Sequence, residues 1–494
     1  MSLAKRAAAG FLWTTLANVG GRIVTIVSTF VVARFVLPFH QGEFNNAYVL
    51  VFTVANATQL GVGQYIAANP KLGRDVAFHG SILTLVAGAI GCVAAFALMH
   101  PMGSLLGSPD MALYVPGLVL AHMIERLGWL PRYVLVRDMQ FRKVGFRALI
   151  GEIVFAGTSI ALAARGFDAF ALVYANIARA VIGLFYLLAV TSWRDYFEPH
   201  KLSRETFRSI LRFGWPVSVS MLLHYGSTTW DNWFMTWKFG SSVTGVYNQA
   251  YKLAELPGTY LGEQINDVLV PTFARLSDAD ARRRGFIRAA SLMALVVFPV
   301  AIGLGSVAYT AVEAFYPPEY AGVAPFLAVL ASLSMMRSLG VLSAGLLQVV
   351  GRTRVLAWID VVLVVILLGL MAILSRFGST WAAAGVGIAL VVNTLHILYE
   401  LRPEGVRIRD VLRSLVGPFA ACMVMGAVVV AVRFPLASTG LHAGLRLVIE
   451  VLVGAVVYVG AALTIARSVS RDFISLAMGV IRRRRGGDGA PESA

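Results

Sequence analysis

Polar side chains recur at helical spacing inside the long apolar stretches of this chain. In the first stretch, Asn18, Arg22 and Thr25 are four and three residues apart, so in a helix they share one face. A charged side chain within hydrocarbon costs about 2.5–3.5 kcal/mol on insertion scales, and it persists where it faces a cavity or a partner. The guanidinium of Arg22 could hold phosphate oxygens there through two parallel hydrogen bonds.

Two later stretches carry polar faces of the same kind, and together the faces predict a central cavity. Amide and ionised side chains in such a cavity could bind a polar substrate, and carboxylates or a His could also take up a cation or a proton. The candidate substrate-binding residues are Arg22, Asn18, Asn56, Asp231, Lys252, Glu255 and Asn248. The candidate coupling residues are Asp231, Glu255, Glu263 and His224.

The same charged residues also have structural interpretations. Lys252 and Glu255 are three residues apart and could pair with each other on one helix. Asp231 could cap a helix end or pair with Lys238, and His224 could be a hydrogen-bonded packing residue. Inter-helix pairing or a place at the inner mouth of the cavity is the simpler explanation for Glu125, Arg126, Arg179, Arg337 and Asp360.

The elements that must position these residues are membrane-spanning helices. The chain has 494 residues, is 58% hydrophobic and 14% charged, and has a mean hydropathy of +0.73. A segment of about 20 apolar residues crosses the hydrocarbon core, and in lipid it must be helical because its backbone groups have no water to bond. The predicted spans are approximately 10–37, 45–68, 78–100, 111–131, 145–164, 168–190, 210–237, 243–271, 287–308, 323–350, 355–375, 380–400, 411–433 and 445–466.

Basic residues are concentrated in every second gap between these spans. Of the 42 Lys and Arg residues, 31 fall on one side and 6 on the other. Positive residues close to spans stay on the cytoplasmic side. The pattern predicts a multi-pass membrane protein with both termini in the cytoplasm. The net charge of +16 is the sum of these loops and of the basic tail, so it does not indicate nucleic-acid binding.

A short sequence repeat indicates internal symmetry. Gly42–Tyr48 recurs as Gly245–Tyr251, with four of seven positions identical, and both copies open an even-numbered span. The fold predicted is all-α, with about 14 transmembrane helices in two pseudo-symmetric six-helix lobes around the cavity, followed by two further helices. The predicted parts are 1–190, an amphipathic linker at 191–209, 210–402, 403–466 and a basic cytoplasmic tail at 467–494.

No pattern typical of an enzyme, a metal site or a nucleotide site is present in the sequence. It contains no GxxxxGK[ST] loop, no HExxH and no CxxC. Cys92 and Cys422 both lie inside apolar stretches, so they provide no disulfide framework. We therefore expect a protein that is not an enzyme and that has no cofactor, although a cation or proton gradient could drive it.

Three groups of motifs resemble the polysaccharide transporter family of Wzx-type flippases, within the multidrug/oligosaccharidyl-lipid/polysaccharide exporter superfamily. They lie between Gly10 and Phe44, between Leu135 and Val173, and between Arg212 and Asp278, where GVYNQAYKLAELPG and VLVPTFARLSD occur. The resemblance covers about the first 285 residues; beyond them the match is in hydropathy alone.

The resemblance implies a flippase that moves an undecaprenyl-diphosphate-linked oligosaccharide across the inner membrane by alternating access. Its further expected partners are membrane lipids and the polysaccharide polymerase machinery, for exopolysaccharide or lipopolysaccharide synthesis. Wzx-type relatives often have twelve spans, whereas this chain has fourteen predicted spans, a layout that the lipid II flippase shares. A lipid II flippase and a drug or cation antiporter of the same superfamily are therefore the alternatives.

Overall fold

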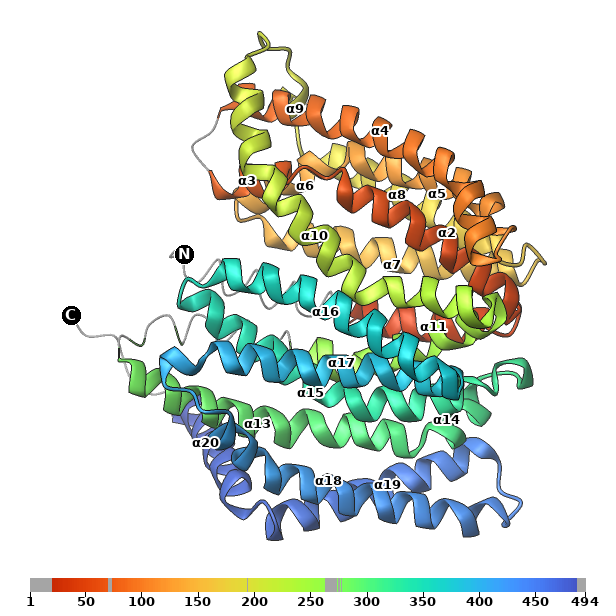
Figure 1. Ribbon diagram of the computed structural model, residues 1–494, viewed down its shortest axis with the longest axis vertical. Coiled ribbons are helices and arrows are strands. Elements are labelled where there is room, and N and C mark those ends of the chain that lie inside the picture. Colours follow the sequence, from red (N-terminus) through yellow and green to blue (C-terminus); the bar gives the residue numbers. More distant parts are fainter. Residues whose placement is uncertain are drawn as a thin grey trace. The chain divides into compact units, whose positions relative to one another are not determined.

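The structure is a computed structural model that describes residues 20–69, 73–192, 194–262 and 278–486, together with Phe273 and Leu276. All regular secondary structure in these residues is helical (Figure 1). Nine of the described helices are long and apolar enough to cross a membrane, and Gly20–Val32 is a shorter apolar helix. The predicted all-α, multi-pass membrane class is confirmed.

The described chain forms two compact units, of which the first contains residues 1–249 and 316–322. In this unit α2 packs against α4, α5 and α10, while α8 packs against both α5 and α7. Its helices are α2 (Pro38–Ala57), α3 (Val62–Ala68), α4 (Arg74–Leu106), α5 (Met111–Leu127), α6 (Trp129–Arg137), α7 (Phe141–Ala163), α8 (Phe170–Val190), α9 (Arg194–Phe197), α10 (Arg204–Phe239), the larger part of α11 (Ser241–Glu255) and the 3-10 turn η2 (Pro318–Tyr320).

The second unit contains residues 250–315 and 323–494. Here α13 and α15 pack against each other, α17 joins α15 to α16, and α18 joins α13 to α19. The elements are the π-helix η1 (Leu256–Leu261), α13 (Ala279–Ser306), α14 (Ala308–Phe315), α15 (Val323–Val349), α16 (Thr353–Leu374), η3 (Ser375–Phe377), α17 (Ser379–Glu400), η4 (Arg402–Glu404), α18 (Ile408–Ala437), α19 (Ala443–Thr464) and α20 (Arg467–Gly486).

Each predicted span falls on a helix, but several helices are broken or longer than expected. The second span divides into α2 and α3 because Leu60 and Gly61 both adopt left-handed backbone angles, with φ of 54°. The fourth divides at Gly128 into α5 and α6, and the eighth passes from α11 into the π-helix η1. The first span is described only from residue 20, so Asn18 lies outside the described residues, as does Glu263 of the eighth.

The predicted amphipathic linker at 191–209 contains α9, and its last six residues begin α10. The Ser203 hydroxyl caps α10 by accepting a hydrogen bond from the backbone N–H of Thr206, and the helix then runs without a break to Phe239. Arg204, Arg208 and Arg212 therefore lie in the first turns of this 36-residue helix. At 1.5 Å per residue α10 is about 54 Å long, which exceeds the ~30 Å thickness of the hydrocarbon core. A place of the linker on the membrane surface stays a prediction.

The boundary between the two compact units differs from the boundary between the two predicted lobes. Helix α10 packs against α2, α3 and α4, so it belongs to the first compact unit, although the predicted second lobe begins at residue 210. The prediction that residues 1–190 and 210–402 form two lobes related by pseudo-symmetry stays a prediction. The predicted basic tail begins as an ordered helix, α20.

The two copies of the repeat motif lie against each other. A Cβ added to Gly42 would clash with the carbonyl oxygen of Ser241, and one added to Gly245 would clash with the carbonyl oxygen of Pro38. Because 38 and 241, like 42 and 245, are equivalent positions at offset 203, these contacts are reciprocal. A local two-fold axis generates reciprocal contacts of this kind, so the repeat corresponds to a structural relation between α2 and α11.

A short segment after α14 also belongs to the first unit. Residues 316–322 are assigned to it, although the helices on both sides of them belong to the second. Tyr320 is fully buried and donates a hydrogen bond to the carbonyl oxygen of Val36 at 2.9 Å. Tyr316 packs edge-on against Phe30, with 5.1 Å between the ring centroids. This segment lies in the longest of the gaps predicted to be extracytoplasmic.

We predict that Gly42→Ala will sharply lower the stability of the protein. The added methyl group has no space against the carbonyl of Ser241, and overpacking of this kind costs roughly 3 kcal/mol. The apparent melting temperature of the purified protein in detergent measures the effect. Gly157→Ala is the matched control: nothing lies within 4 Å of its added methyl group on α7, so it should raise stability by roughly 0.5–1 kcal/mol. Equal melting temperatures for the two variants would contradict the tight crossing.

Candidate functional site

A buried hydrogen-bond network joins α2, α10 and α11 inside the first unit. Asp231 accepts hydrogen bonds from the backbone and side-chain N–H groups of Asn232, at 3.0 and 3.1 Å, and its other carboxylate oxygen accepts from the Tyr247 hydroxyl. The side-chain oxygen of Asn232 in turn accepts from the amides of Asn45 and Asn248, at 3.0 and 3.2 Å. Asn45 and Asn248 are equivalent positions of the repeat, so the two copies share one acceptor.

This network changes the interpretation of two predicted site residues. Asp231 is 1% exposed and Asn248 is 7% exposed, so in this structure neither lines an open cavity. The suggested Asp231–Lys238 pair is not among the ion pairs of the described residues, and the observed partners of Asp231 lie on α10 and α11. The network continues through further buried polar residues: Glu43, Asn46, Ser108, Thr236, Ser241 and Thr244.

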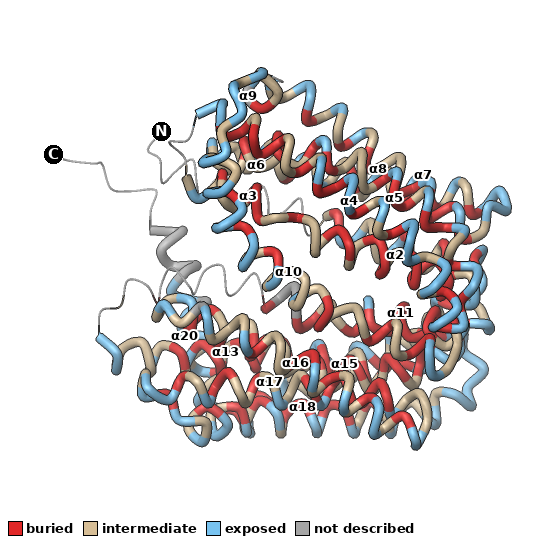
Figure 2. The backbone as a smooth tube through the Cα atoms, turned by 45° about the horizontal axis from the view of Figure 1, so that its top comes forward, coloured by how far each residue is buried: buried red, intermediate tan, exposed pale blue. Residues whose placement is uncertain are grey.

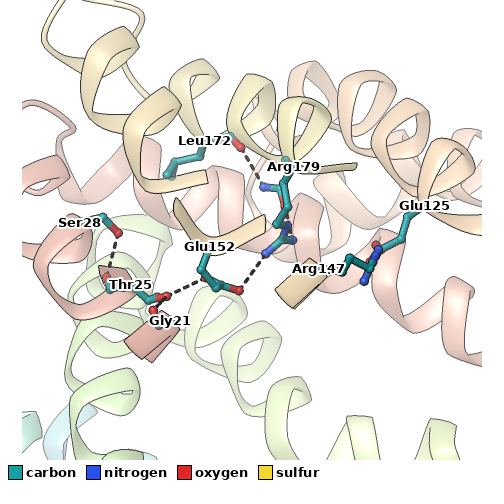
Figure 3. Close-up of polar contacts among 9 residues, drawn as sticks. Gly21, Thr25, Ser28, Glu125, Arg147, Glu152, Leu172 and Arg179 are labelled. Atoms are coloured by element: carbon teal, nitrogen blue, oxygen red, sulfur yellow. Dashed lines mark hydrogen bonds and ion pairs between the residues drawn. The ribbon is translucent and has the colours of Figure 1, made fainter. Parts of the chain in front are cut away.

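A second polar cluster contains two arginine–carboxylate pairs from α5, α7 and α8 (Figure 3). Arg179 lies 3.8 Å from the Glu152 carboxylate and donates to the side-chain oxygen of Asn176 at 2.7 Å. Arg147 lies 3.7 Å from Glu125. The two pairs place four ionised side chains among neighbouring helices of the first unit, where mutual attraction offsets part of the cost of removing them from water.

Glu152 also connects this cluster to the first described helix. The Thr25 hydroxyl lies 2.7 Å from its second carboxylate oxygen, and a Cβ on Gly21 would lie 3.2 Å from its Cγ (Figure 3). The side chain of Arg22 follows Gly21 directly and is exposed. Thr25 of the first polar face thus lies beside the arginine–carboxylate cluster, on the helix that also carries Arg22.

Arg126 stabilises the break between α2 and α3. It is 4% exposed and donates to the carbonyl oxygen of Ala55 at 2.7 Å, to the carbonyl oxygen of Thr58 at 3.0 Å and to the ring of His122 at 2.9 Å. The last carbonyls of a helix have no partner within the helix and carry partial negative charge, so a cation is favourable there. Arg126 thus joins α5 to the end of α2 through hydrogen bonds to backbone carbonyl oxygens.

In the second unit, Glu255 pairs with Arg337 of α15 at 3.1 Å. Arg337 also donates to the Tyr251 hydroxyl at 3.1 Å. The alternative pair of Lys252 with Glu255 is not among the ion pairs of the described residues. Lys252 itself is exposed. Glu255 is the last residue of α11 before the π-helix, and single π turns are frequent at functional sites.

The other predicted residues are placed less specifically. The side chain of His224 is exposed on α10. The amide of Asn56 donates to the carbonyl oxygen of Phe52, four residues earlier on the same helix, at 2.8 Å. Because Arg22 belongs to the first unit and Lys252 and Glu255 to the second, a cavity that they share remains a prediction.

Comparisons with known proteins show the family to which the chain belongs. The family model described as "Polysaccharide biosynthesis protein" matches residues 31–325, which is more than half of the chain. The chain belongs to this family. The match ends within α15 and includes both copies of the repeat and most of the two polar clusters.

The names of two relatives also refer to polysaccharide biosynthesis or transport. The lipopolysaccharide biosynthesis protein WzxC of Escherichia coli (strain K12) is 25% identical over 353 residues, which cover 69% of each chain. The succinoglycan biosynthesis transport protein ExoT of Rhizobium meliloti (strain 1021) is 24% identical over 477 residues, which cover 94% of each chain. The predicted resemblance to the polysaccharide transporter family is confirmed.

Solved structures show the same fold at low identity. The lipid II flippase MurJ, in its inward closed conformation, superposes with a TM-score of 0.74 at 13% identity, over 92% of this chain and 99% of that chain. An inward-facing transporter of the multidrug resistance MATE family gives a TM-score of 0.61 at 17% identity, over 78% of this chain and 95% of that chain. This member of the polysaccharide biosynthesis family therefore shares its fold with these two solved structures.

The residue that the sequence analysis missed is Glu152. It is a lone carboxylate in the apolar stretch 145–164, and the same signal had drawn attention to Arg22 in the first stretch. The difference is that Glu152 has no regular polar neighbours along its own helix; its partners, Thr25 and Arg179, come from other helices. Its importance becomes visible only once these helices pack together.

We predict that Glu152→Gln will destabilise this cluster. The amide can still accept the hydrogen bond from Thr25, but Arg179 then loses its ionised partner in a partly buried site. A cost of roughly 1–2 kcal/mol is expected, since both side chains keep some solvent contact. Thermal unfolding of the purified variant measures it, and Glu319→Gln, at an exposed carboxylate, is the control that should change little.

A double-mutant cycle makes this test specific to the pair. The Glu152→Gln/Arg179→Gln variant removes both charges, so it should be more stable than the sum of the two single losses implies. Strict additivity of the two substitutions would show that the charges do not interact.

Proposed function

We propose that this protein is a flippase that moves a polyprenyl-diphosphate-linked oligosaccharide repeat unit across the bacterial cytoplasmic membrane by alternating access. The observation that carries the proposal is the group of two arginine–carboxylate pairs within apolar helices of a polysaccharide biosynthesis protein, which Thr25 joins to the helix that carries Arg22. A diphosphate is the part of such a substrate that is most costly to move through lipid, so it most needs a cationic partner.

Arg22 is the residue proposed to contact the diphosphate. A guanidinium presents a planar pair of donors that matches two phosphate oxygens, and the attraction is strong where the dielectric constant is low. Arg147 and Arg179 are each beside a carboxylate, and the side chain of Arg22 is exposed. We assign to the two pairs the task of holding the neighbouring helices in place around Arg22.

The sugar and the lipid make different demands. A saccharide needs hydrogen-bonding partners, which the amide of Asn56 on α2 and the ammonium group of Lys252 on α11 are proposed to provide. The polyprenyl chain can stay in the bilayer beside the helices, so it needs no site of its own. The names of the relatives support a saccharide as the cargo, because one is a lipopolysaccharide biosynthesis protein and another a succinoglycan biosynthesis transport protein.

The candidate for coupling that the contacts favour is Glu255. Uptake of a proton or a cation by this carboxylate would weaken its ion pair with Arg337, so it could bias two arrangements of α11 and α15. Asp231 is a weaker candidate here, because its oxygens already accept several buried hydrogen bonds. His224 and Glu263 remain proposals on the sequence pattern alone.

We predict that Arg22→Ala will abolish glycan export without lowering the amount of protein in the membrane. The measurement is surface or secreted polysaccharide in a strain whose only copy of the gene carries the substitution, with the protein level followed by immunoblot. Arg22→Lys should restore export in part, since an ammonium group keeps the charge but lacks the planar pair of donors.

Arg34→Ala is the matched control for this test. Arg34 is an exposed arginine that follows the same helix and is expected outside the membrane core, so its loss should leave export unchanged. Normal export by the Arg22→Ala variant would overturn the assignment of the diphosphate to this residue.

We also expect both termini to lie in the cytoplasm. Reporter fusions after Gly107 and Ala437, which end α4 and α18, should read as periplasmic, and fusions after Gly351 and Gly405 as cytoplasmic. The physical reason is the unequal distribution of Lys and Arg between the two sets of gaps. A cytoplasmic signal from either of the first two sites would contradict this topology.

A further inference from the structure

The last helix of the chain, α20, has an apolar face that the protein does not cover. Val469, Phe473 and Leu476 are four and three residues apart, so they lie on one side of the helix. Val469 is partly buried against the apolar cluster that contains Leu295 and Ala421, whereas Phe473 is 43% exposed and Leu476 is 44% exposed. Ile474 and Met478, at 41% and 50%, add to this exposed apolar surface. Four large apolar side chains are thus exposed on a helix that is not one of the candidate spans.

The start of α20 is held against other helices of the second unit. The Ser470 hydroxyl donates to the carbonyl oxygen of Ala462 at 2.8 Å, and Ser470 is buried. Asp472 binds Arg288 of α13 through two hydrogen bonds, at 2.7 and 2.5 Å. The Arg288 guanidinium holds the pKa of the Asp472 carboxyl below its usual value. The helix therefore starts in a defined position beside α13, α18 and α19 (Figure 1).

The charge of α20 is almost entirely positive. Its 20 residues contain six arginines, Arg467, Arg471 and the run Arg482–Arg485, against one acidic residue, Asp472. That one carboxylate is already bound to Arg288, so it does not neutralise the arginines of its own helix. An amphipathic helix that combines an apolar face with several arginines has the composition of a segment that lies in a membrane interface.

The position of α20 in the chain favours lipid as its occupant. Helix α19 ends at Thr464, and its own apolar side chains are strongly exposed, with Val456 at 74% and Val459 at 55%. Figure 2 colours the backbone of the described residues by their burial. In a membrane-spanning helix such exposed apolar side chains face the acyl chains. Because α20 begins at Arg467, three residues after the end of α19, it starts close to where the span leaves the hydrocarbon.

We propose that α20 lies in the membrane interface and binds anionic phospholipid headgroups, of the phosphatidylglycerol type, in the leaflet where α19 ends. The apolar side chains enter the acyl boundary, and the positive charge of the helix attracts the anionic headgroups. The pair of Asp472 with Arg288 transmits the position of this helix to α13. The proposal is independent of the proposed transport function.

The test uses the full-length chain with a fluorophore that reports on its surroundings. A Met478→Cys variant is labelled with an environment-sensitive dye in a background in which Cys92 and Cys422 are replaced by Ala. It is reconstituted into vesicles of phosphatidylcholine with or without phosphatidylglycerol. We expect a blue-shifted dye that lipid-borne quenchers reach in the anionic vesicles, and less of both effects in neutral vesicles or in high salt.

Changing Arg482–Arg485 to Gln should remove the difference between the two kinds of vesicle. Each arginine near an anionic surface strengthens binding about fivefold. In anionic vesicles, the ratio of lipid-bound to unbound α20 should therefore fall by at least roughly tenfold in this variant. The control is Arg407→Gln with Arg409→Gln, which removes two exposed arginines at the start of α18 and should leave the difference intact.

Three results would overturn the proposal. The first is a dye that no lipid-borne quencher reaches in either vesicle. The second is quenching that is equal in neutral and anionic vesicles, which would leave a purely apolar anchor. The third is a dye signal that depends on protein density instead of lipid charge, because that would indicate a second copy of the chain as the occupant of this face.

Discussion

The close crossing of α2 and α11 is the contact on which the rest of the first unit depends. Gly42 and Gly245 have no side chains, so each helix backbone reaches the carbonyl oxygens of the other. This approach is what allows Asn45 and Asn248 to share the side chain of Asn232, and it lets Tyr247 reach Asp231. In a bilayer, helices associate by packing and by hydrogen bonds, since lipid removes the hydrophobic drive between them. The polar network therefore depends on two glycines, because only residues without a side chain allow the two helices to come this close.

Pairing of polar groups explains where the remaining charges lie. A buried ion or amide without a partner is costly, so each helix that carries one is positioned by the helix that satisfies it. Glu152 joins α7 to α8 and to the first described helix, Arg337 joins α15 to the end of α11, and the Glu450 carboxylate accepts from Thr310 at 2.8 Å between α19 and α14. These contacts give each apolar bundle a defined arrangement that apolar packing alone would leave adjustable.

The proposed transport site and the proposed lipid contact use the same chemistry in different surroundings. Arg22 is proposed to hold a phosphate within the membrane, where the low dielectric constant strengthens the attraction. The arginines of α20 are proposed to hold phosphates at the surface, where salt and water weaken it and several charges must act together. A substrate diphosphate thus requires one well-placed guanidinium, while a surface anchor requires many.

The sequence by itself determined the membrane class, the positions of the spans and the polar faces, because hydropathy and helical spacing are properties of single segments. It also drew attention to the repeat, to Arg22 and to the role of Arg126. Only the tertiary structure decided that Asp231 and Asn248 lie in a buried network, that Glu255 pairs with Arg337 and not with Lys252, and that Glu152 belongs to the site. The structure alone likewise showed the break between α2 and α3 and the change from α11 to the π-helix η1. The physical reason is that the partner of a buried polar group lies on another helix, and spacing along one helix carries no information about which helix that will be.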